Sequence, residues 1–110
     1  MQKLDLADHI IRSLCPDDDY KRAIDNMKGA KELTDELNDR VGAGRLTLEQ
    51  VEAALSYLSF RDLIQAFRTR PYGAVGDPDN NLVYDYYLTT KGEDLVVSGY
   101  GVRDLARRNM

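Results

Sequence analysis

Two β-rich segments, separated by a long turn-forming stretch, constrain the fold of this chain more than any other feature. Residues 63–67 and 82–89 are rich in aliphatic and aromatic side chains, and residues 68–81 between them are rich in Gly, Pro, Asp and Asn. The pattern predicts a β-hairpin with a long tip. Because a lone two-stranded hairpin is unstable in water, it must pack against the helices predicted around it.

Hydrophobic periodicity predicts helices before the hairpin. Apolar residues recur every three or four positions over residues 3–14 and again over residues 30–41. Between them, Tyr20, Ile24 and Met27 indicate a second helix that begins after Asp17-Asp18-Asp19 and ends near Gly29. Shorter helices are expected over residues 91–97 and 102–108.

The helix that follows Thr47 has the clearest start. Thr47 and Gln50 have the spacing of a capping box, in which a hydroxyl and a long polar side chain satisfy the first backbone amides. The expected core face consists of Leu48, Val51, Ala54, Leu55 and Leu58. The opposite face consists of Glu49, Gln50, Glu52, Ala53 and Ser56.

Length and charge limit the class of protein. The chain has 110 residues, 43% of them hydrophobic, and a net charge of −4, which together indicate one compact globular domain. Residues 1–60 carry 8 basic and 12 acidic side chains. This balance argues against a basic nucleic-acid coat protein or a polybasic membrane-surface protein, but DNA binding depends on where the basic residues lie.

The cysteine content and the apolar runs indicate a cytoplasmic protein. Cys15 is the only cysteine, so an internal disulfide is impossible and a reducing compartment is expected. The apolar runs are only a few residues long, and acidic residues interrupt any signal-peptide core near the N-terminus. No membrane partner is expected.

Four segments together resemble a winged helix-turn-helix domain of the small prokaryotic and phage regulator type. Glu32–Leu37 is similar to the first helix of the helix-turn-helix, and Leu46–Leu58 to the recognition helix. Leu63-Ile64 then begins the wing, and Tyr86–Leu95 is similar to the tyrosine, leucine-threonine and glycine pattern that closes it. At the end of the recognition helix, Asp62 takes the place of the family's usual left-handed glycine.

The resemblance implies an α+β, mainly helical fold: a winged helix with three to four helices and a two-stranded hairpin as the wing. Residues 1–29 would form N-terminal helices, residues 30–97 the winged-helix core, and residues 98–110 a tail or short helix of the same compact domain.

A DNA-binding transcriptional regulator is the function that the resemblance implies, with double-stranded DNA as the partner and a homodimer formed through the terminal helices. The expected base contacts come from Gln50 and Ser56. Phosphate or minor-groove contacts are expected from Arg45, Thr47, Arg68, Arg70, Tyr72 and Lys91. A simpler interpretation is that Thr47 only caps its helix and that the basic side chains are merely solvated.

The charges favour a second interpretation. Glu49 and Glu52 lie on the face that would approach DNA, where carboxylates repel a polyanion. The chain could instead be an acidic protein-interaction module, such as an adaptor or a viral inhibitor of a nucleic-acid-handling complex. Tyr84 and Tyr86 alternate onto one strand face and Tyr87 onto the other, which favours core and cross-strand packing, with an aromatic contact surface as the alternative.

No pattern indicates catalysis, a cofactor or a metal. His9 is the only histidine and Cys15 has no companion base, so we expect structural roles for both. Asp17-Asp18-Asp19 lacks the glycine and glutamate of a calcium loop and is interpreted as a helix start. We therefore expect a protein that is not an enzyme.

Overall fold

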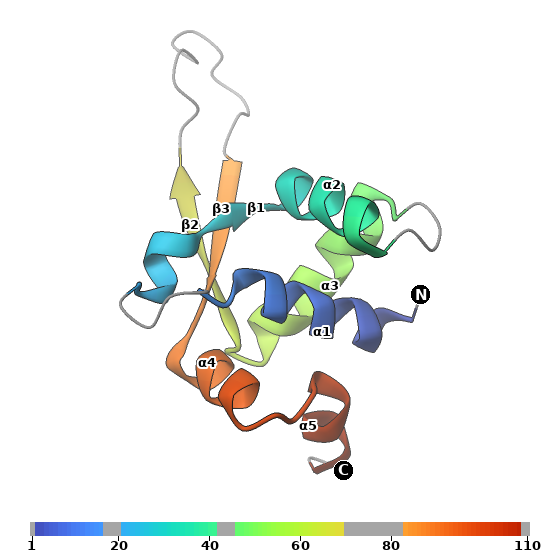
Figure 1. The fold of residues 1–110 in the computed structure, drawn as a ribbon. Helices are drawn as coiled ribbons and strands as arrows, with labels where there is room; N and C mark the ends of the chain where they lie inside the picture. Colours follow the sequence, from blue (N-terminus) through green and yellow to red (C-terminus); the bar gives the residue numbers. More distant parts are fainter. Residues whose placement is uncertain (1, 17–20, 42–45, 70–82, 109–110) are drawn as a thin grey trace, which may run out of the picture.

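The computed structural model describes residues 2–16, 21–41, 46–69 and 83–108, with the backbone alone for Val41, Arg68, Thr69, Val83 and residues 106–108. Figure 1 shows the order of its helices and strands. They are α1 (Lys3–Leu14), the 3₁₀ turn η1 (Ala23–Asn26), β1 (Lys28–Gly29), α2 (Ala30–Val41), α3 (Leu48–Phe60), β2 (Ile64–Thr69), β3 (Val83–Leu88), α4 (Thr90–Val97) and α5 (Val102–Arg108).

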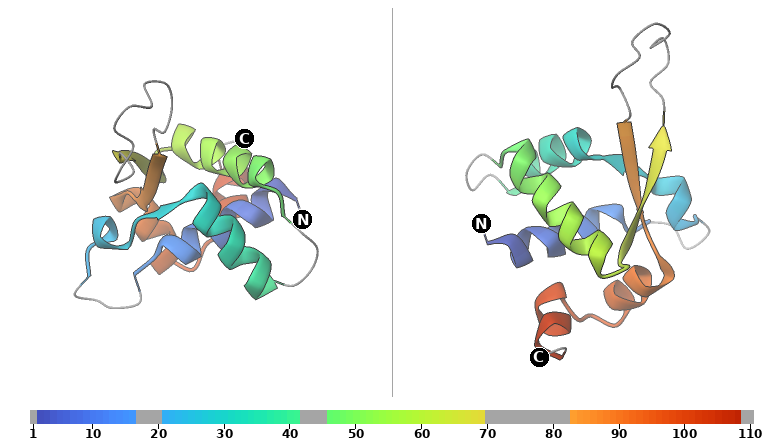
Figure 2. Two further views of the ribbon diagram at one scale, coloured as in Figure 1. Left: turned by 90° about the horizontal axis from the view of Figure 1, so that it is seen from above. Right: turned by 180° about the vertical axis from the view of Figure 1, so that it is seen from behind.

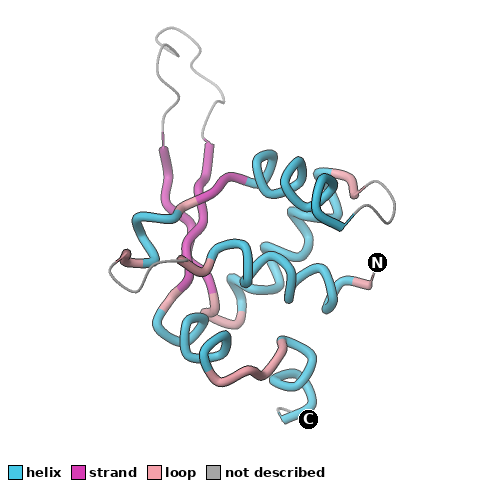
Figure 3. Tube along the Cα trace, in the orientation of Figure 1, coloured by secondary structure: helices cyan, strands magenta, loops and turns pink. Residues whose placement is uncertain are grey.

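Three strands form one antiparallel sheet in the order β1-β3-β2 (magenta in Figure 3). β2 and β3 pair from Ile64 opposite Leu88 to Thr69 opposite Val83, as the hairpin pattern predicts. The prediction of a two-stranded sheet is nevertheless wrong by one strand, because Lys28 and Gly29 pair with the other edge of β3. A strand of two residues is too short to show an alternating hydrophobic pattern in the sequence. It is extended because it hydrogen-bonds to the edge of β3. The chain is thus a small, mainly helical α+β protein.

The predicted second helix is also wrong. Within residues 21–29, the part of the predicted helix that the structure describes, only the single turn η1 is helical, and the chain then extends into β1. Ile24, expected on an apolar stripe, is 38% exposed, while Ala23 is buried. Asn26 donates a hydrogen bond to the Leu14 carbonyl oxygen at 3.0 Å, which holds this segment against the end of α1. Tyr20 and the three aspartates before it lie outside the described residues.

The core lies between α1, α2, α3 and the end of the sheet where β2 begins. Figure 2 shows α3 running beside the hairpin and ending at that point. The buried side chains of the core come from helices and strands along the whole described chain: Leu6, Ala7, Ile10, Ile11, Leu14, Ala23, Leu33, Leu37, Val51, Ala54, Leu55, Leu58, Leu63, Ile64, Leu88 and Val102. The expected face of α3 is confirmed except for Leu48, which is 43% exposed because it stands in the first turn, beyond the core.

The end of α3 has a left-handed cap. Asp62 has φ 60°, the geometry that the resemblance places at this position. The Leu63 and Asp62 amides donate to the carbonyl oxygens of Leu58 and Ser59, at 3.1 Å each. This is a Schellman arrangement, and the buried pair Leu58 and Leu63 supplies its hydrophobic contact. The cap turns the chain from α3 directly into β2.

The C-terminal residues form a helix that returns to α1. The Val102 amide donates to Asp8 Oδ1 at 2.7 Å, so a side chain 94 residues away caps the start of α5. Arg103 pairs with Asp5 at 3.1 Å and donates to Gln2 Oε1 at 3.0 Å. Of the two outcomes expected for residues 98–110, a helix is observed from Val102 to Arg108, and Arg103 belongs to its docking contacts.

Candidate functional site

The first turn of α3 is capped as predicted. The Gln50 amide donates to Thr47 Oγ1 at 3.2 Å, and the Thr47 amide donates to Gln50 Oε1 at 2.9 Å. The capping box is therefore confirmed. Both predicted DNA contacts at this turn take part in it, which leaves the Gln50 side-chain amino group for other hydrogen bonds.

The exposed face of α3 carries negative charge only. Glu49, Glu52, Ala53, Ser56 and Phe60 lie on the side away from the buried residues, and no Lys or Arg occurs between Leu48 and Phe60. Residues 52, 56 and 60 are spaced by four, so they form one row along the helix. This row runs from the Glu52 carboxylate to the Phe60 ring, and Phe60 is 87% exposed.

A shallow groove lies between this row and the hairpin. Its lining residues come from α3, β2 and β3: Ser56, Ser59, Phe60, Ala66, Tyr84 and Tyr86. Its volume is about 360 Å³. Tyr84 is 44% exposed, so the expectation of core packing is wrong for this ring, and Tyr86 is half-buried. Phe60 is not among the predicted site residues, although its helical spacing from Glu52 and Ser56 is a signal that the sequence contains.

The tyrosine in the groove is electrostatically linked to α3. Burial raises the pKa of Tyr86 above its ordinary value near 10, and the negative charge of Glu52, followed by that of Tyr84, adds to the increase. Glu52 therefore acts on the Tyr86 hydroxyl across the space between helix and strand.

Replacing Tyr86 by Phe should flatten the loss of stability at alkaline pH. A raised pKa in the folded state means that the folded protein holds this proton when the unfolded chain has lost it. Its contribution to the free energy of unfolding is complete below about pH 10 and is lost as the pH rises through the folded-state pKa. Urea unfolding between neutral and strongly alkaline pH measures both proteins. Parallel curves for the two proteins above pH 10 would contradict the expectation.

Two cations lie against an aromatic ring of α3. The Arg61 guanidinium and the Lys3 ammonium group stack on the Tyr57 ring, 4.1 Å and 5.0 Å from its centroid. The buried Arg61 Nε makes no hydrogen bond to the described residues, so the ring is its principal contact. Both cations are thus held beside α3 by the Tyr57 ring.

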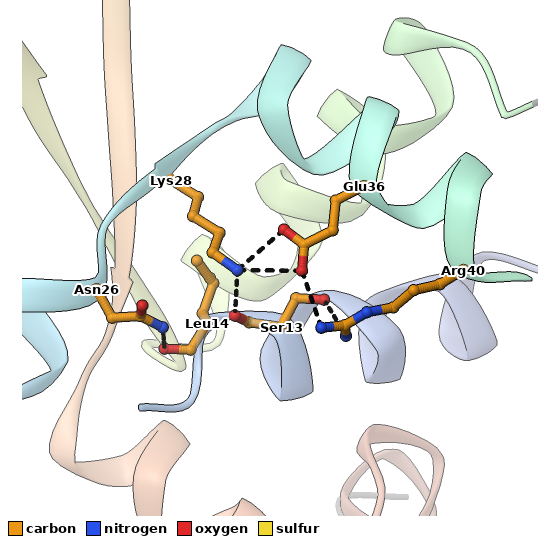
Figure 4. Close-up of polar contacts among 6 residues, drawn as sticks. All are labelled: Ser13, Leu14, Asn26, Lys28, Glu36 and Arg40. Carbon is orange, nitrogen blue, oxygen red and sulfur yellow. Dashed lines mark hydrogen bonds and ion pairs between the residues drawn. The ribbon is translucent and has the colours of Figure 1, made fainter. Parts of the chain in front are cut away.

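A second polar cluster joins α1, β1 and α2 (Figure 4). Lys28 Nζ donates to the Ser13 carbonyl oxygen at 2.9 Å and pairs with Glu36 at 2.9 Å. Arg40 pairs with the same carboxylate at 3.1 Å. A cation among the last carbonyl groups of α1 also suits the dipole of that helix. These contacts connect α1, β1 and α2, which gives the cluster a structural role.

The structure brings only some of the predicted DNA-contacting residues together. Thr47 and Gln50 share the first turn of α3, and Ser56 lines the groove. Lys91 is exposed on α4, which Figure 1 places away from that first turn. Arg68 pairs with Tyr84 in the sheet, but its side chain is outside the described atoms. Arg45, Arg70 and Tyr72 lie outside the described residues.

The remaining candidates show no metal-binding geometry. His9 is half-buried on α1, and Cys15 is half-buried against the core. Within the described residues, no group of three His, Cys, Asp or Glu side chains could hold a metal ion. No helix in the described part of the chain combines the length and apolarity needed to cross a membrane.

Comparison with known proteins found no family model, no curated protein and no solved structure that matches this chain.

Proposed function

We propose that this chain is a winged helix-turn-helix protein. The order of one helix, a short strand, two helices and a hairpin supports this assignment, with α2 and α3 as the helix-turn-helix and β2 and β3 as the wing. The strand order β1-β3-β2 and the left-handed Asp62 after α3 agree with it.

The best-supported function is a non-catalytic protein-interaction module of the cytoplasm that uses the exposed face of α3. One observation carries this proposal: the helix that would read DNA presents Glu49 and Glu52 and contains no Lys or Arg. Such a face repels phosphates and attracts a basic partner surface. The groove beside it adds exposed aromatic area, which is typical of protein interfaces.

A DNA-binding transcriptional regulator is the second candidate, and the element order favours it. In this case the protein would bind as a homodimer, and the wing would supply Arg68 and Arg70, with Arg45, Tyr72 and Lys91 as further backbone contacts. Gln50 and Ser56 would face the bases. The two carboxylates of α3 would then oppose binding rather than support it.

Binding to a labelled mixed-sequence duplex separates the two candidates. We expect no change in fluorescence anisotropy at tens of micromolar protein, even in low salt, because the phosphates meet Glu49 and Glu52. The titration is repeated with the double variant Glu49→Gln/Glu52→Gln, which lacks these two negative charges. The regulator would be supported instead by two results together. The wild-type protein would bind the duplex with an affinity that falls steeply with salt, and the double variant would bind it several-fold more tightly.

A crosslinking amino acid at Ser56 tests the interaction module directly. When this variant is expressed in cells of the organism that the protein comes from, we expect one crosslinked product, whose mass exceeds that of the protein by the mass of a single partner. Glu49→Lys/Glu52→Lys should abolish this product, since charge reversal repels a basic partner. The same crosslinker at the exposed Lys31 on α2 is the matched control. A product that survives charge reversal would show that α3 is not the binding face.

A further inference from the structure

The groove between α3 and the hairpin combines three kinds of group. Phe60, Tyr84 and Tyr86 supply aromatic rings, and the Ser56 and Ser59 hydroxyls lie among them. Glu52 stands one helical turn before Ser56 on the same row, and its negative charge acts on Tyr86 in the groove. The Phe60 side chain is almost entirely exposed, so its ring is available to a ligand.

A positively charged side chain matches this set of groups. The face of an aromatic ring attracts a cation, and the strength of the attraction grows as water is excluded. The carboxylate supplies the counter-charge, and the serine hydroxyls can accept hydrogen bonds from a guanidinium or ammonium group. A nucleic acid could stack its bases here, but its phosphates would meet Glu52.

The same helix already binds cations in this way. Tyr57, which follows Ser56, holds the Arg61 guanidinium against its ring at 4.1 Å. This internal contact shows that a tyrosine ring on α3 holds a guanidinium in the folded protein. The groove contains two further tyrosine rings, Tyr84 and Tyr86, and the negative charge of Glu52 acts on Tyr86.

We propose that the groove binds an Arg- or Lys-bearing segment of a partner protein, with the cation between the tyrosine rings and Glu52 and an apolar neighbour on Phe60. This inference rests on the proposed interaction module and names the chemistry of its partner. The groove volume of about 360 Å³ is near the lower end of the range for small-ligand sites, so it accommodates a few side chains and not a folded domain.

Selection from a random displayed-peptide library against the whole protein tests the proposal. We expect the enriched peptides to contain Arg or Lys next to an apolar residue. Glu52→Gln and Phe60→Ala should each weaken the selected peptide by about tenfold, the effect of losing one charged or aromatic anchor. Glu32→Gln, the same charge change at an exposed position of α2, should leave its affinity unchanged.

Each remaining outcome has a defined meaning. Enriched peptides without a cation, an absence of enriched peptides, or equal affinity for the Glu52→Gln and wild-type proteins would overturn the assignment of the groove. If Glu49→Gln weakens binding while Glu52→Gln and Phe60→Ala do not, the groove is wrong but α3 remains the interaction face. If no α3 substitution affects the peptide, the proposed function falls too. Concentration-dependent dimerisation that Phe60→Ala abolishes would instead identify a second copy as the occupant.

Discussion

Replacing Gly92 by Ala should lower the free energy of unfolding by about 3 kcal/mol, despite the better helix propensity of alanine. A Cβ atom at position 92 would lie 2.2 Å from the Leu63 carbonyl oxygen and 3.1 Å from Leu88 Cδ2. The carbonyl group is backbone, and it accepts the Thr89 amide at 3.1 Å, so it cannot move without loss of that hydrogen bond. The favourable propensity of alanine, about 1 kcal/mol, is the smaller effect. Urea unfolding followed by circular dichroism measures the difference.

Two neighbouring substitutions control for the position. Lys91→Ala lies on the exposed surface and should change the free energy of unfolding by less than about 0.5 kcal/mol. Gly99→Ala meets no atom within 4 Å, but its φ of +78° should cost about 1 kcal/mol. A Gly92→Ala protein as stable as the Lys91→Ala protein would show that α4 does not approach the Leu63 carbonyl group this closely.

Replacing Lys28 by Met should cost about 2 kcal/mol of stability. The Lys28 ammonium group joins the Ser13 carbonyl oxygen and the Glu36 carboxylate, and its side chain is 18% exposed. Its removal leaves a partly buried carboxylate and a helix-terminal carbonyl group with one donor fewer. The expected cost is below that of an isolated buried pair, about 3–5 kcal/mol, because Arg40 still pairs with Glu36. Thermal or urea unfolding near neutral pH measures it.

The double variant Lys28→Met/Glu36→Leu tests the explanation. It removes both charges at once, so it should be more stable than Lys28→Met alone. Arg40→Ala, whose side chain is 62% exposed, should have an effect below about 1 kcal/mol. The single variant Glu36→Leu completes the comparison. If the double variant loses as much free energy of unfolding as Lys28→Met and Glu36→Leu lose together, the two charges are not coupled, and the cluster in Figure 4 contributes no cooperative stability.

Local signals predicted much of the fold correctly. The capping box at Thr47, the helices over residues 3–14 and 30–41 and the two hairpin strands depend on residues within a few positions of one another. The predicted second helix failed because its apolar stripe had no core surface to cover, as the exposed Ile24 shows. Lys28 and Gly29, at the end of the predicted helix, instead pair with β3.

The candidate site could be predicted only in part. Glu49, Glu52 and Ser56 follow from helical spacing, which places them opposite the buried face of α3. The groove joins that helix to Ala66, Tyr84 and Tyr86, and no sequence pattern states which strand face meets which helix. The predicted DNA contacts rest on the resemblance, and of their described members only Thr47 and Gln50 share one turn.

The sequence by itself determined the helices α1, α2 and α3, the hairpin and the acidic face of α3, because capping, periodicity and charge act over short distances along the chain. Only the tertiary structure decided that β1 completes the sheet, that Gly92 must lack a side chain and that Phe60 shares a groove with two tyrosines. Each of these depends on contacts between residues far apart in sequence, and packing of the folded chain alone brings such residues together.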